Sequence, residues 1–512
     1  MAQTLNLPAS VRPLLPLFTV VKGVWLVGGA VRSLLLGQEA VDLDFAVAGG
    51  GRRLAKRVAD ALGGAYYDLD RERDAGRVVL QSEVGRLTRL DFSRLRGEDI
   101  LEDLRGRDFT VNALAVSLED SPQLLDPTGG LGDLRNRVLR ACSAGALAQD
   151  PVRALRAVRF AIQLGFRMER ATAGQIVAAA DKLPQVAGER TRDEFMNILD
   201  LPYPGRALRL LDRLSLLEVV LPEMADLRDL RQPPPHEYLA LEHTLAVSDR
   251  LAEILDPPTA SARGESAGDL TKAHMASQIG RFRGELMRYL RQQPTSGRNL
   301  RQLLFFSALM HDAGKPACRS EEGDGRIRFI GHEQVGAELA ASRAGALRLS
   351  NSEVKILKTI ILNHMWPGAL QSSGGATPRA TYRFWRQNGS DGISVILLSL
   401  ADLLGMRPLP PEETAWSSRL EVARTLLLGH LEMLPSLLDG PPLLRGGDLM
   451  AALDQPPGPL IGRLLEYVRE AQAAGEVKTR DEALALVKQA VADRGTDPSV
   501  WDRASTVMDT GP

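Results

Sequence analysis

The sequence predicts an α+β protein in which a small head with a mixed sheet precedes all-helical regions. Three observations support this fold class. Strand and helix patterns alternate between about residues 23 and 140, and strand patterns stop after Arg140. The length of 512 residues also calls for several domains, at roughly 150 residues each. We therefore expect a sheet covered on one side, followed by a longer helical body.

Four segments of the head have the residue pattern of strands. They are residues 24–29, 41–47, 77–84 and 86–92. Between them, a short helix is expected over 30–37. A longer helix over 52–64 is expected to end at Gly63-Gly64.

The pair Asp150-Pro151 is expected to open a helix over 150–166, because Asp is a good N-cap and Pro is preferred at the first helical position. A proline-rich joint at 231–238 marks a domain boundary. The predicted domains are 1–140, 141–230, 231–440 and 441–512. Residues 256–269 are interpreted as a flexible insertion within a stretch of about 256–300, and the end of the tail, 493–512, is expected to be poorly ordered.

The composition excludes several classes of protein. The formal net charge of −1 gives no global attraction to nucleic acid, so an RNA-binding surface would need local clusters of charge. Cys142 and Cys318 supply neither a disulfide framework nor a zinc motif. No signal peptide is evident, and the most apolar run, 393–404, is too short to span a bilayer. We expect a cytoplasmic protein without a membrane segment.

Asp42 and Asp44 lie two residues apart on a predicted strand, so both carboxylates point to one face. The turn Gly28-Gly29 and Arg32 precede them, and Asp91 on another predicted strand is a third candidate carboxylate. Such a group can hold Mg²⁺ beside a triphosphate, as phosphoryl transfer requires. The alternative is that the carboxylates only end a strand and the glycines only form a turn.

Two further polar clusters follow the first. Arg107, Asp108 and Asn112 could bind a ribose or order the wall of a site; alternatively, Asp108 caps a helix. Asp150 and Arg153 stand three apart at a helix start and could pair with the edge of a base, unless Asp150 is only a cap.

The helix that follows is locally basic. Its arginines, which suit an RNA backbone or form a solvated face, are Arg156, Arg159, Arg167 and Arg170.

Histidines and aspartates recur in the third predicted domain. In order they are His243, His311, Asp312, His332, His364 and Asp402. Imidazoles and carboxylates suit a transition metal, although a lone buried histidine is more often a hydrogen-bonded core residue.

The chain resembles the class II tRNA nucleotidyltransferases, the CCA-adding and poly(A) polymerase family within the DNA polymerase beta-like superfamily. The matching motifs are GGAVR…DLDF, GRDFTVNALA with LLDPTGGLGDLRNRVLR, QDPVRALRAVRFAIQLGF and GERTRDEFMNIL, in family order over residues 24 to about 225. The resemblance implies that Asp42 and Asp44 are catalytic and bind Mg²⁺. It implies that Asp150 and Arg153 select CTP or ATP in place of a template.

Other nucleotide-binding residues follow from the same resemblance. Those implied to contact or support the nucleotide are Gly28, Gly29, Arg32, Arg107, Asp108, Asn112, Arg156, Arg159, Glu189, Arg190 and Glu194. Within the motifs, Ser33, Gly106 and Gln149 depart from the family's usual Asp, Arg and Glu. The interval from Asp91 to Arg107 also looks shorter than in enzymes that add all of CCA, and resembles enzymes that add only CC.

The segment FFSALMHDAGKP resembles the HD phosphohydrolase superfamily. This resemblance implies a divalent metal held by four residues: His243, His311, Asp312 and Asp402. It also implies a second metal or phosphate position at His332 and His364, with Lys315 as a phosphate contact. The implied architecture is a nucleotidyltransferase head, an all-α neck and body, an all-α HD domain and a helical tail that binds RNA.

The leading hypothesis is an enzyme that adds C, or CCA, to the 3′ end of tRNA from CTP and ATP, releasing pyrophosphate. One alternative is an A-adding enzyme or poly(A) polymerase. Others are a metal-dependent phosphohydrolase whose head only recruits RNA, and an RNA-binding module without activity. The sequence leaves the nucleotide added, the second metal and the oligomeric state open.

Overall fold

The computed structural model describes residues 7, 11–19, 21–40, 42–81, 87–118, 122–256, 267–295, 297–408, 411–433 and 441–502. The chain divides into two compact units. One comprises Met1–Phe195 with Leu210–Val220, and the other Met196–Arg209 with Leu221–Pro512.

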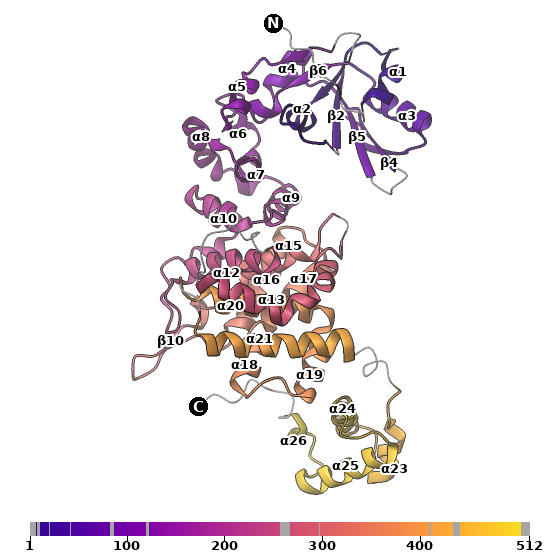
Figure 1. Cartoon of the computed structure of the whole chain (residues 1–512), viewed down its shortest axis with the longest axis vertical. Helices are drawn as coiled ribbons and strands as arrows, with labels where there is room; N and C mark the ends of the chain where they lie inside the picture. Colours follow the sequence, from indigo (N-terminus) through magenta and orange to yellow (C-terminus); the bar gives the residue numbers. More distant parts are fainter. Residues whose placement is uncertain are drawn as a thin grey trace. The chain divides into compact units, whose positions relative to one another are not determined.

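The first unit contains a seven-stranded mixed sheet in the order β3-β4-β5-β2-β1-β6-β7 (Figure 1). β2 and β5 are parallel, and every other neighbouring pair is antiparallel. The strands are β1 (Val24–Val27), β2 (Asp42–Val47), β3 (Ala65–Asp70), β4 (Ala75–Gln81), β5 (Leu87–Arg94), β6 (Ala115–Ser117) and β7 (Leu124–Leu125). The predicted α+β class with a mixed-sheet head is therefore confirmed, whereas β3, β6 and β7 were not predicted.

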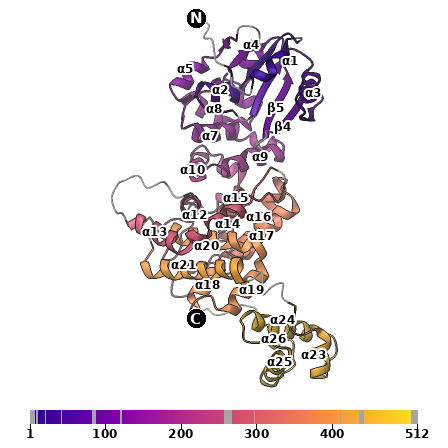
Figure 2. The ribbon, with the colours of Figure 1, turned by 45° about the vertical axis from the view of Figure 1, so that its right-hand side comes forward.

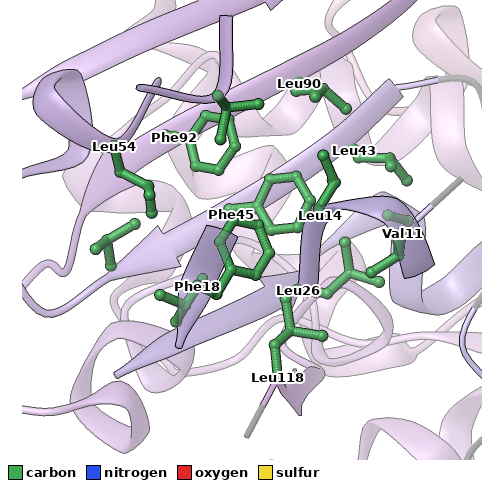
Figure 3. Packing of buried hydrophobic residues seen from close by; sticks show 14 of the residues in the cluster. Val11, Leu14, Phe18, Leu26, Leu43, Phe45, Leu54, Leu90, Phe92 and Leu118 are labelled. Atoms are coloured by element: carbon green, nitrogen blue, oxygen red, sulfur yellow. The ribbon is translucent and has the colours of Figure 1, made fainter. Parts of the chain in front are cut away.

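One face of this sheet carries the main core of the head (Figure 3). Phe45 of β2 stacks on Phe92 of β5 with ring centroids 4.7 Å apart, and Phe18 of α1 (Leu15–Phe18) meets Phe45 edge-on. α3 (Gly51–Leu62) contributes Leu54 and lies beside β4 and β5 (Figure 2). Burying these aromatic and aliphatic side chains is the main source of stability in the head.

The opposite face is only partly covered. α4 (Ile100–Arg105) packs Ile100 and Leu104 against Val27 of β1 and Ala46 of β2. This smaller cluster lies over the β1, β2 and β6 side of the sheet. Asp42 and Asp44 project from the same face, at the border of the covered part.

The neck begins differently from the prediction. Asp150 has an extended φ of −145° and is not a side-chain N-cap; α7 (Arg153–Leu164) starts three residues later, with Val152 at its N-cap. The carbonyl of Asp150 instead accepts a bond from the Arg153 amide at 3.0 Å. The carboxylate is thus left for other contacts. Strand structure also does not end at Arg140, because β8 (Val138–Leu139) pairs in parallel with β9 (Arg167–Met168).

The remaining helices of the first unit are short to medium in length. They are α2 (Gly29–Leu35), α5 (Gly130–Arg135), α6 (Ala146–Gln149), α8 (Arg170–Ala180) and α11 (Leu217–Val220); α9 (Gly188–Leu199) and α10 (Pro204–Arg213) cross the division between the units.

The described part of the second unit is helical except for a small hairpin, β10 (Ser320–Glu321) and β11 (Ile327–Arg328). Its helices are α12 (Ala240–Leu255), α13 (Ala267–Ile279), α14 (Arg283–Leu290), α15 (Leu300–Met310), α16 (His332–Ala346), α17 (Asn351–Asn363), α18 (Trp366–Ser372), α19 (Pro378–Asn388), α20 (Gly392–Gly405) and α21 (Glu413–Leu428). Residues 257–266 of the expected insertion lie outside the described residues, and 267–290 are largely helical.

The tail contains α23 (Gly446–Leu453), α24 (Pro459–Ala473), α25 (Arg480–Arg494) and α26 (Ser499–Asp502), with a hydrophobic cluster of its own. The expectation of poor order from 493 onward is wrong as far as Asp502. Trp501 is 5% exposed, and its ring meets Tyr467 edge-on at 5.5 Å. Residues 503–512 lie outside the described residues. Among the described helices, none has the length and apolar character needed to cross a membrane.

Candidate active site and metal centre

Three carboxylates lie on one face of the head sheet. Asp44 of β2 is directly opposite Asp91 of β5 in the parallel register, and Asp42 is opposite Arg89. Arg77 of β4 lies beside Asp91 and donates two hydrogen bonds to it, each 2.7 Å long. Strand alternation therefore brings together the carboxylates that the sequence suggested, and it adds Arg77, which sequence reasoning missed.

The charges at this face favour a cation. The pKa of Asp44 is raised because the protein around it removes water and because Asp91 and Asp42 add negative charge; Arg107 opposes the shift. Arg77 engages Asp91, while Arg89 Nη1 approaches Asp42 Oδ1 at 3.9 Å. A divalent ion between Asp42 and Asp44 would relieve their mutual repulsion, so the donor set fits Mg²⁺.

The glycine turn lies against the same carboxylates. Gly28 has φ +69°, and a Cβ at this position would lie 3.0 Å from Arg107 Nη1 and 3.7 Å from Asp44 Oδ2. A side chain would therefore strain the backbone and fill the space between Asp44 and Arg107. Asp103 holds Arg107 from behind through hydrogen bonds of 2.9 and 3.0 Å.

A chain of buried polar contacts joins α2 of the head to α7 of the neck. Arg32 donates to the Asn112 side chain, Asn112 donates to Asp108 Oδ1 at 3.1 Å, and Arg156 Nε donates to Asp108 Oδ2 at 2.9 Å. Burial alone would raise the pKa of Asp108, but Arg156 and Asn112 hold it below its usual value. The alternative that Asp108 only caps a helix does not account for its contacts with Asn112 and Arg156.

Arginines surround one aromatic ring in this region. The guanidinium carbons of Arg32, Arg156 and Arg159 lie 5.1, 5.6 and 4.4 Å from the centre of the Phe160 ring. Arg32 is thus held by Asn112 and Phe160, so Ser33, which departs from the family pattern, does not leave it without support.

Asp150 and Arg153 lie side by side, with Arg153 Nε 3.7 Å from Asp150 Oδ2. Arg153 also donates to the carbonyls of Gly106 and Arg107, and Arg190 Nη2 donates to Asp150 Oδ2 at 2.8 Å. Asp150 Oδ1 is buried without a hydrogen-bond partner among the described residues. It is therefore an acceptor that a bound nucleotide could use.

The three residues expected behind this pair differ in their contacts. Arg190 contacts Asp150 directly, whereas Glu194 binds Arg159 at 2.9 Å and approaches Arg156 at 3.6 Å. Glu189 is exposed at the start of α9. Arg190 therefore lies against Asp150, and Glu194 lies against the neighbouring arginines of α7. Glu189 joins neither group.

A second cluster of ionisable groups lies within the helical unit, centred on Asp312. Asp312 Oδ2 is 3.3 Å from His311 Nε2 and 3.4 Å from His243 Nε2. On its other side, Asp312 Oδ1 is 3.5 Å from His332 Nε2, and Asp402 Oδ1 is 3.1 Å from His243 Nε2. The three triads whose ligand atoms lie within 4.8 Å of one another are His236–His243–Asp402, His243–His311–Asp312 and Asp312–His332–His364.

The hydrogen bonds of these histidines define their tautomers. Nδ1 faces a backbone carbonyl oxygen in each case: Gly405 for His243, Ala308 for His311, Phe329 for His332, Ile361 for His364 and Pro233 for His236. Because a carbonyl only accepts, Nδ1 carries the proton in the neutral ring and Nε2 carries the lone pair.

Three of these lone pairs have no hydrogen-bond donor within the described part of the chain. Nε2 of His243, His311 and His332 is buried without a hydrogen-bond partner among the described residues. Burial, with the neighbouring His311 and His332, lowers the pKa of His364 to about 3. Asp312 and Asp402 instead raise the pKa of His311, against the effect of burial. A divalent metal would take the place of a proton between these ring nitrogens and the buried carboxylates, so the donor set fits such an ion.

Lys315 and His236 extend the cluster. Lys315 Nζ donates to Asp312 Oδ2 and to Gln232 Oε1, both at 2.6 Å, so it holds a candidate ligand as well as facing the site. His236 lies 4.9 Å from His243 between ring centroids and was missed, because its sequence context is a proline-rich joint. Gly314 lies so close to α16 that a Cβ would be 2.1 Å from the His332 carbonyl oxygen.

Four protein-family models match the chain. They describe a Poly A polymerase head domain at residues 24–140, an RNA- and SrmB-binding site of polymerase A at 165–227, an HD domain at 241–407 and a tRNA nucleotidyltransferase domain 2 at 442–487.

Curated relatives match over nearly the whole chain. The CC-adding tRNA nucleotidyltransferase of Geobacter sulfurreducens is 33% identical over 90% of this chain and 90% of its own length. The A-adding tRNA nucleotidyltransferase of Deinococcus radiodurans is 35% identical over 93% of this chain and 97% of its own. A CC-adding enzyme of Thermus thermophilus is 33% identical over 92% and 94%.

Solved structures share the fold. The Thermotoga maritima CCA-adding enzyme complexed with tRNA has a TM-score of 0.56 at 18% identity, covering 96% of this chain and 99% of that one. A CCA-adding enzyme in complex with CTP has a TM-score of 0.60 at 19% identity, covering 95% and 96%.

Proposed function

Because the chain belongs to the tRNA nucleotidyltransferase family, we propose that it adds cytidine residues to the 3′ end of tRNA from CTP, with release of pyrophosphate. The observation that carries the proposal is the juxtaposition of Asp42, Asp44 and Asp91 on one sheet face with the open turn at Gly28. In this proposal the three carboxylates would be metal ligands, and the triphosphate would bind between Asp44 and Arg107, where Gly28 carries no side chain. The two unpaired cysteines are consistent with action in the cytoplasm.

Asp42 and Asp44 would hold Mg²⁺, with Asp91 as a third carboxylate. When bound, such ions supply Lewis-acid stabilisation of the attacking and leaving oxygens. Arg107 and Arg32, on the Gly28 side, would bind the triphosphate and fix its orientation. The 3′-hydroxyl of the tRNA would then attack the α-phosphate, forming a new P–O bond as the bond to pyrophosphate breaks.

Asp150 and Arg153 would read the base. Arg153 supplies donors and Asp150 supplies an acceptor, so the pair can match the polar edge of cytosine without a nucleic-acid template. Arg190 would hold Asp150 in the orientation that this recognition needs. The side chains therefore select the nucleotide by hydrogen bonding, supported by the neck helices.

The connection after β5 supports addition of C without A. Only residues 95–99 separate β5 from α4, and they are fixed by local bonds: Arg96 N donates to Asp103 at 3.0 Å, and Asp99 caps Glu102 N at 2.8 Å. A short, pinned connection leaves no long loop that could reshape the pocket for ATP.

A second candidate is A addition, which the Deinococcus radiodurans relative favours because that protein is an A-adding enzyme. Three tRNAs ending at the discriminator base, at C and at CC separate the two functions. Each is incubated with CTP, ATP or both, and the products are sized. CC addition is supported if CTP extends the tRNAs that end at the discriminator base and at C, while ATP does not extend the tRNA that ends at CC. Extension of only the CC-ended tRNA, by ATP, assigns A addition instead.

The variant Asp44→Ala tests the site itself. It is expected to abolish incorporation while leaving tRNA binding in a gel-shift assay intact. Asp60→Ala, an exposed carboxylate on α3, is the matched control and should remain active. Full incorporation by Asp44→Ala would refute the assignment of the metal-binding carboxylates.

The helical unit favours a second, phosphohydrolase activity. Its buried His and Asp side chains fit a divalent metal, with His243, His311, Asp312 and Asp402 as ligands; His332, His364 and Lys315 would form a second metal or phosphate position. Release of phosphate from RNA with a 2′-phosphate end is expected, as is hydrolytic opening of a 2′,3′-cyclic phosphate to a monophosphate end. His311→Ala should abolish the release and Asp44→Ala should leave it unchanged. The reverse pattern would assign the activity to the head.

A further inference from the structure

The head sheet fixes the side from which the tRNA end must arrive, given the proposed function on which this inference rests. Gly28, Arg32 and Arg107 lie on the β1 and β6 side of Asp44, and this is the side proposed for the triphosphate. Attacking and leaving oxygens are roughly in line in phosphoryl transfer. The attacking hydroxyl must therefore approach from the opposite side, over β5, β4 and β3.

The register of these strands aligns one row of side chains across that side. Asp44 is opposite Asp91, Asp91 is opposite Arg77, and Arg77 is opposite Tyr67 on the edge strand β3. Paired residues in neighbouring strands project to the same face. Tyr67 therefore points to the face that carries the carboxylates, whereas Tyr66 packs against the core on the other face.

This part of the face is open in the first unit. The α4 cluster covers β1, β2 and β6, whereas the Tyr67 residue is 54% exposed and the Arg89 side chain is also 54% exposed. Leu69, at the bulge that follows Tyr67, is 46% exposed. Exposed apolar side chains such as Tyr67 and Leu69 on an edge strand favour unwanted association between molecules, unless they bind a partner.

The position of this face and its exposed aromatic side chain match one kind of occupant. Three strand spacings of about 4.8 Å place the Tyr67 backbone roughly 14 Å from that of Asp44, a span that the last unpaired nucleotides can cross. The hairpin that follows Tyr67 carries Arg71 and Arg73, whose side chains are 82% and 70% exposed. Their Nε atoms lie 3.6 and 3.7 Å from carboxylate oxygens of Asp68 and Asp70, so the hairpin adds no net positive charge. An exposed aromatic side chain is a common platform on which a base of single-stranded RNA stacks.

We propose that Tyr67 stacks on an unpaired base of the tRNA 3′ end, upstream of the nucleotide whose hydroxyl reacts. Tyr67 is a positioning residue in this role, because it touches the primer and not the reacting atoms. Stacking holds the strand over β4 and β5 so that its last hydroxyl reaches Asp44 and Asp91.

Steady-state kinetics with Tyr67→Ala and Tyr67→Phe tests this assignment. Tyr67→Ala is expected to raise the KM for tRNA about 10-fold or more, with the KM for CTP and the kcat at saturating tRNA unchanged. Tyr67→Phe keeps the ring and should behave as the wild type. Leu62→Ala, an exposed side chain at the end of α3, is the matched control and should change nothing.

A direct readout uses tRNA carrying 2-aminopurine in its unpaired 3′ end. Wild type and Tyr67→Phe should quench its fluorescence on binding, and Tyr67→Ala should not. An unchanged KM and unchanged quenching in Tyr67→Ala would overturn the proposal, as would an equal loss in Tyr67→Phe. Failure of the wild type to extend any tRNA would instead refute the proposed function, so the two failures are distinguishable.

Discussion

Asp91 of β5 lies directly opposite Asp44 of β2, and Arg77 of the next strand, β4, donates two hydrogen bonds of 2.7 Å to the Asp91 carboxylate. Asp91 of the candidate metal site is therefore oriented by an arginine, whereas Asp44 lies beside Gly28 and Asp42 is approached by Arg89 at 3.9 Å. This relationship makes Asp91 either a metal ligand or only a partner of Arg77, and the two roles have different consequences.

Asp91→Asn separates these roles. If Asp91 helps to hold Mg²⁺, the variant should lower the incorporation rate about 10-fold to 100-fold and raise the Mg²⁺ concentration that gives half-maximal rate. A Mg²⁺ titration of single-nucleotide incorporation measures both. Arg77→Met is the comparison, since it removes the ion pair but leaves the carboxylate. Equal rates and an unshifted titration in Asp91→Asn would leave Asp91 with no part in the site.

Asp108→Asn should destabilise the head. Asp108 is buried beside Arg156, whose side chain is 37% exposed and keeps a second carboxylate neighbour in Glu194. Removing the charge of Asp108 is therefore expected to lower the free energy of unfolding by about 1–2 kcal/mol. Because the folded pKa of Asp108 lies below its usual value of 3.8, this stabilisation is fully present above about pH 5 and is lost as the pH falls through the folded pKa.

Thermal melts of both proteins between pH 8 and pH 3 check this pH dependence. The difference in Tm between wild type and Asp108→Asn should be constant above about pH 5 and shrink in acid. Asp60→Asn, on the exposed side of α3, should show no such difference. A difference in Tm that grows as the pH falls would contradict the lowered pKa of Asp108.

Arg190→Ala should weaken nucleotide selection more than catalysis. Arg190 holds Asp150 at 2.8 Å, so its removal frees the acceptor that is proposed to read the base. The preference for CTP over UTP, measured as the ratio of kcat/KM values, is expected to fall about 10-fold. Glu189→Ala is the matched control, because Glu189 is exposed at the start of the same helix. An unchanged ratio in Arg190→Ala would argue against base reading by Asp150.

His243→Ala should reduce the metal content of the helical unit. His243 Nε2 lies within 3.4 Å of carboxylate oxygens on both Asp312 and Asp402, so its loss breaks two of the three candidate triads. Metal bound after dialysis, measured by inductively coupled plasma mass spectrometry, should fall while tRNA extension persists. His274→Ala, on α13, serves as the control. Retention of the full metal content would place the ion elsewhere.

Residues close in sequence were the easiest to interpret correctly. The alternation of Asp42 and Asp44 on a strand, and the pairing of His311 with Asp312, depend on local geometry that the sequence states directly. The fold class could be predicted in the same way, because the spacing of apolar residues within each segment indicates whether that segment is a helix or a strand.

Contacts between segments that are far apart in the chain could not be predicted from the sequence alone. β3 was missed because its residues are largely exposed and lack a clear apolar alternation, and Arg77 could be matched with Asp91 only once the order of the strands was known. Asp150 was expected to cap its helix, yet Arg190, from a helix 40 residues away, competes for its carboxylate. His236 joins its cluster only through the path of the chain after the proline-rich joint.

The chain of bonds from Arg32 through Asn112 and Asp108 to Arg156 has one more consequence. It ties the side chain proposed to face the phosphates to the helix that carries Arg153, the side chain proposed to face the base. The separation between the two ends of the nucleotide pocket is thereby fixed by covalent chain and buried polar contacts. We expect the distance between Arg32 and Arg153 to stay the same in the free and the nucleotide-bound protein, so that the phosphate and base contacts are set before the nucleotide binds.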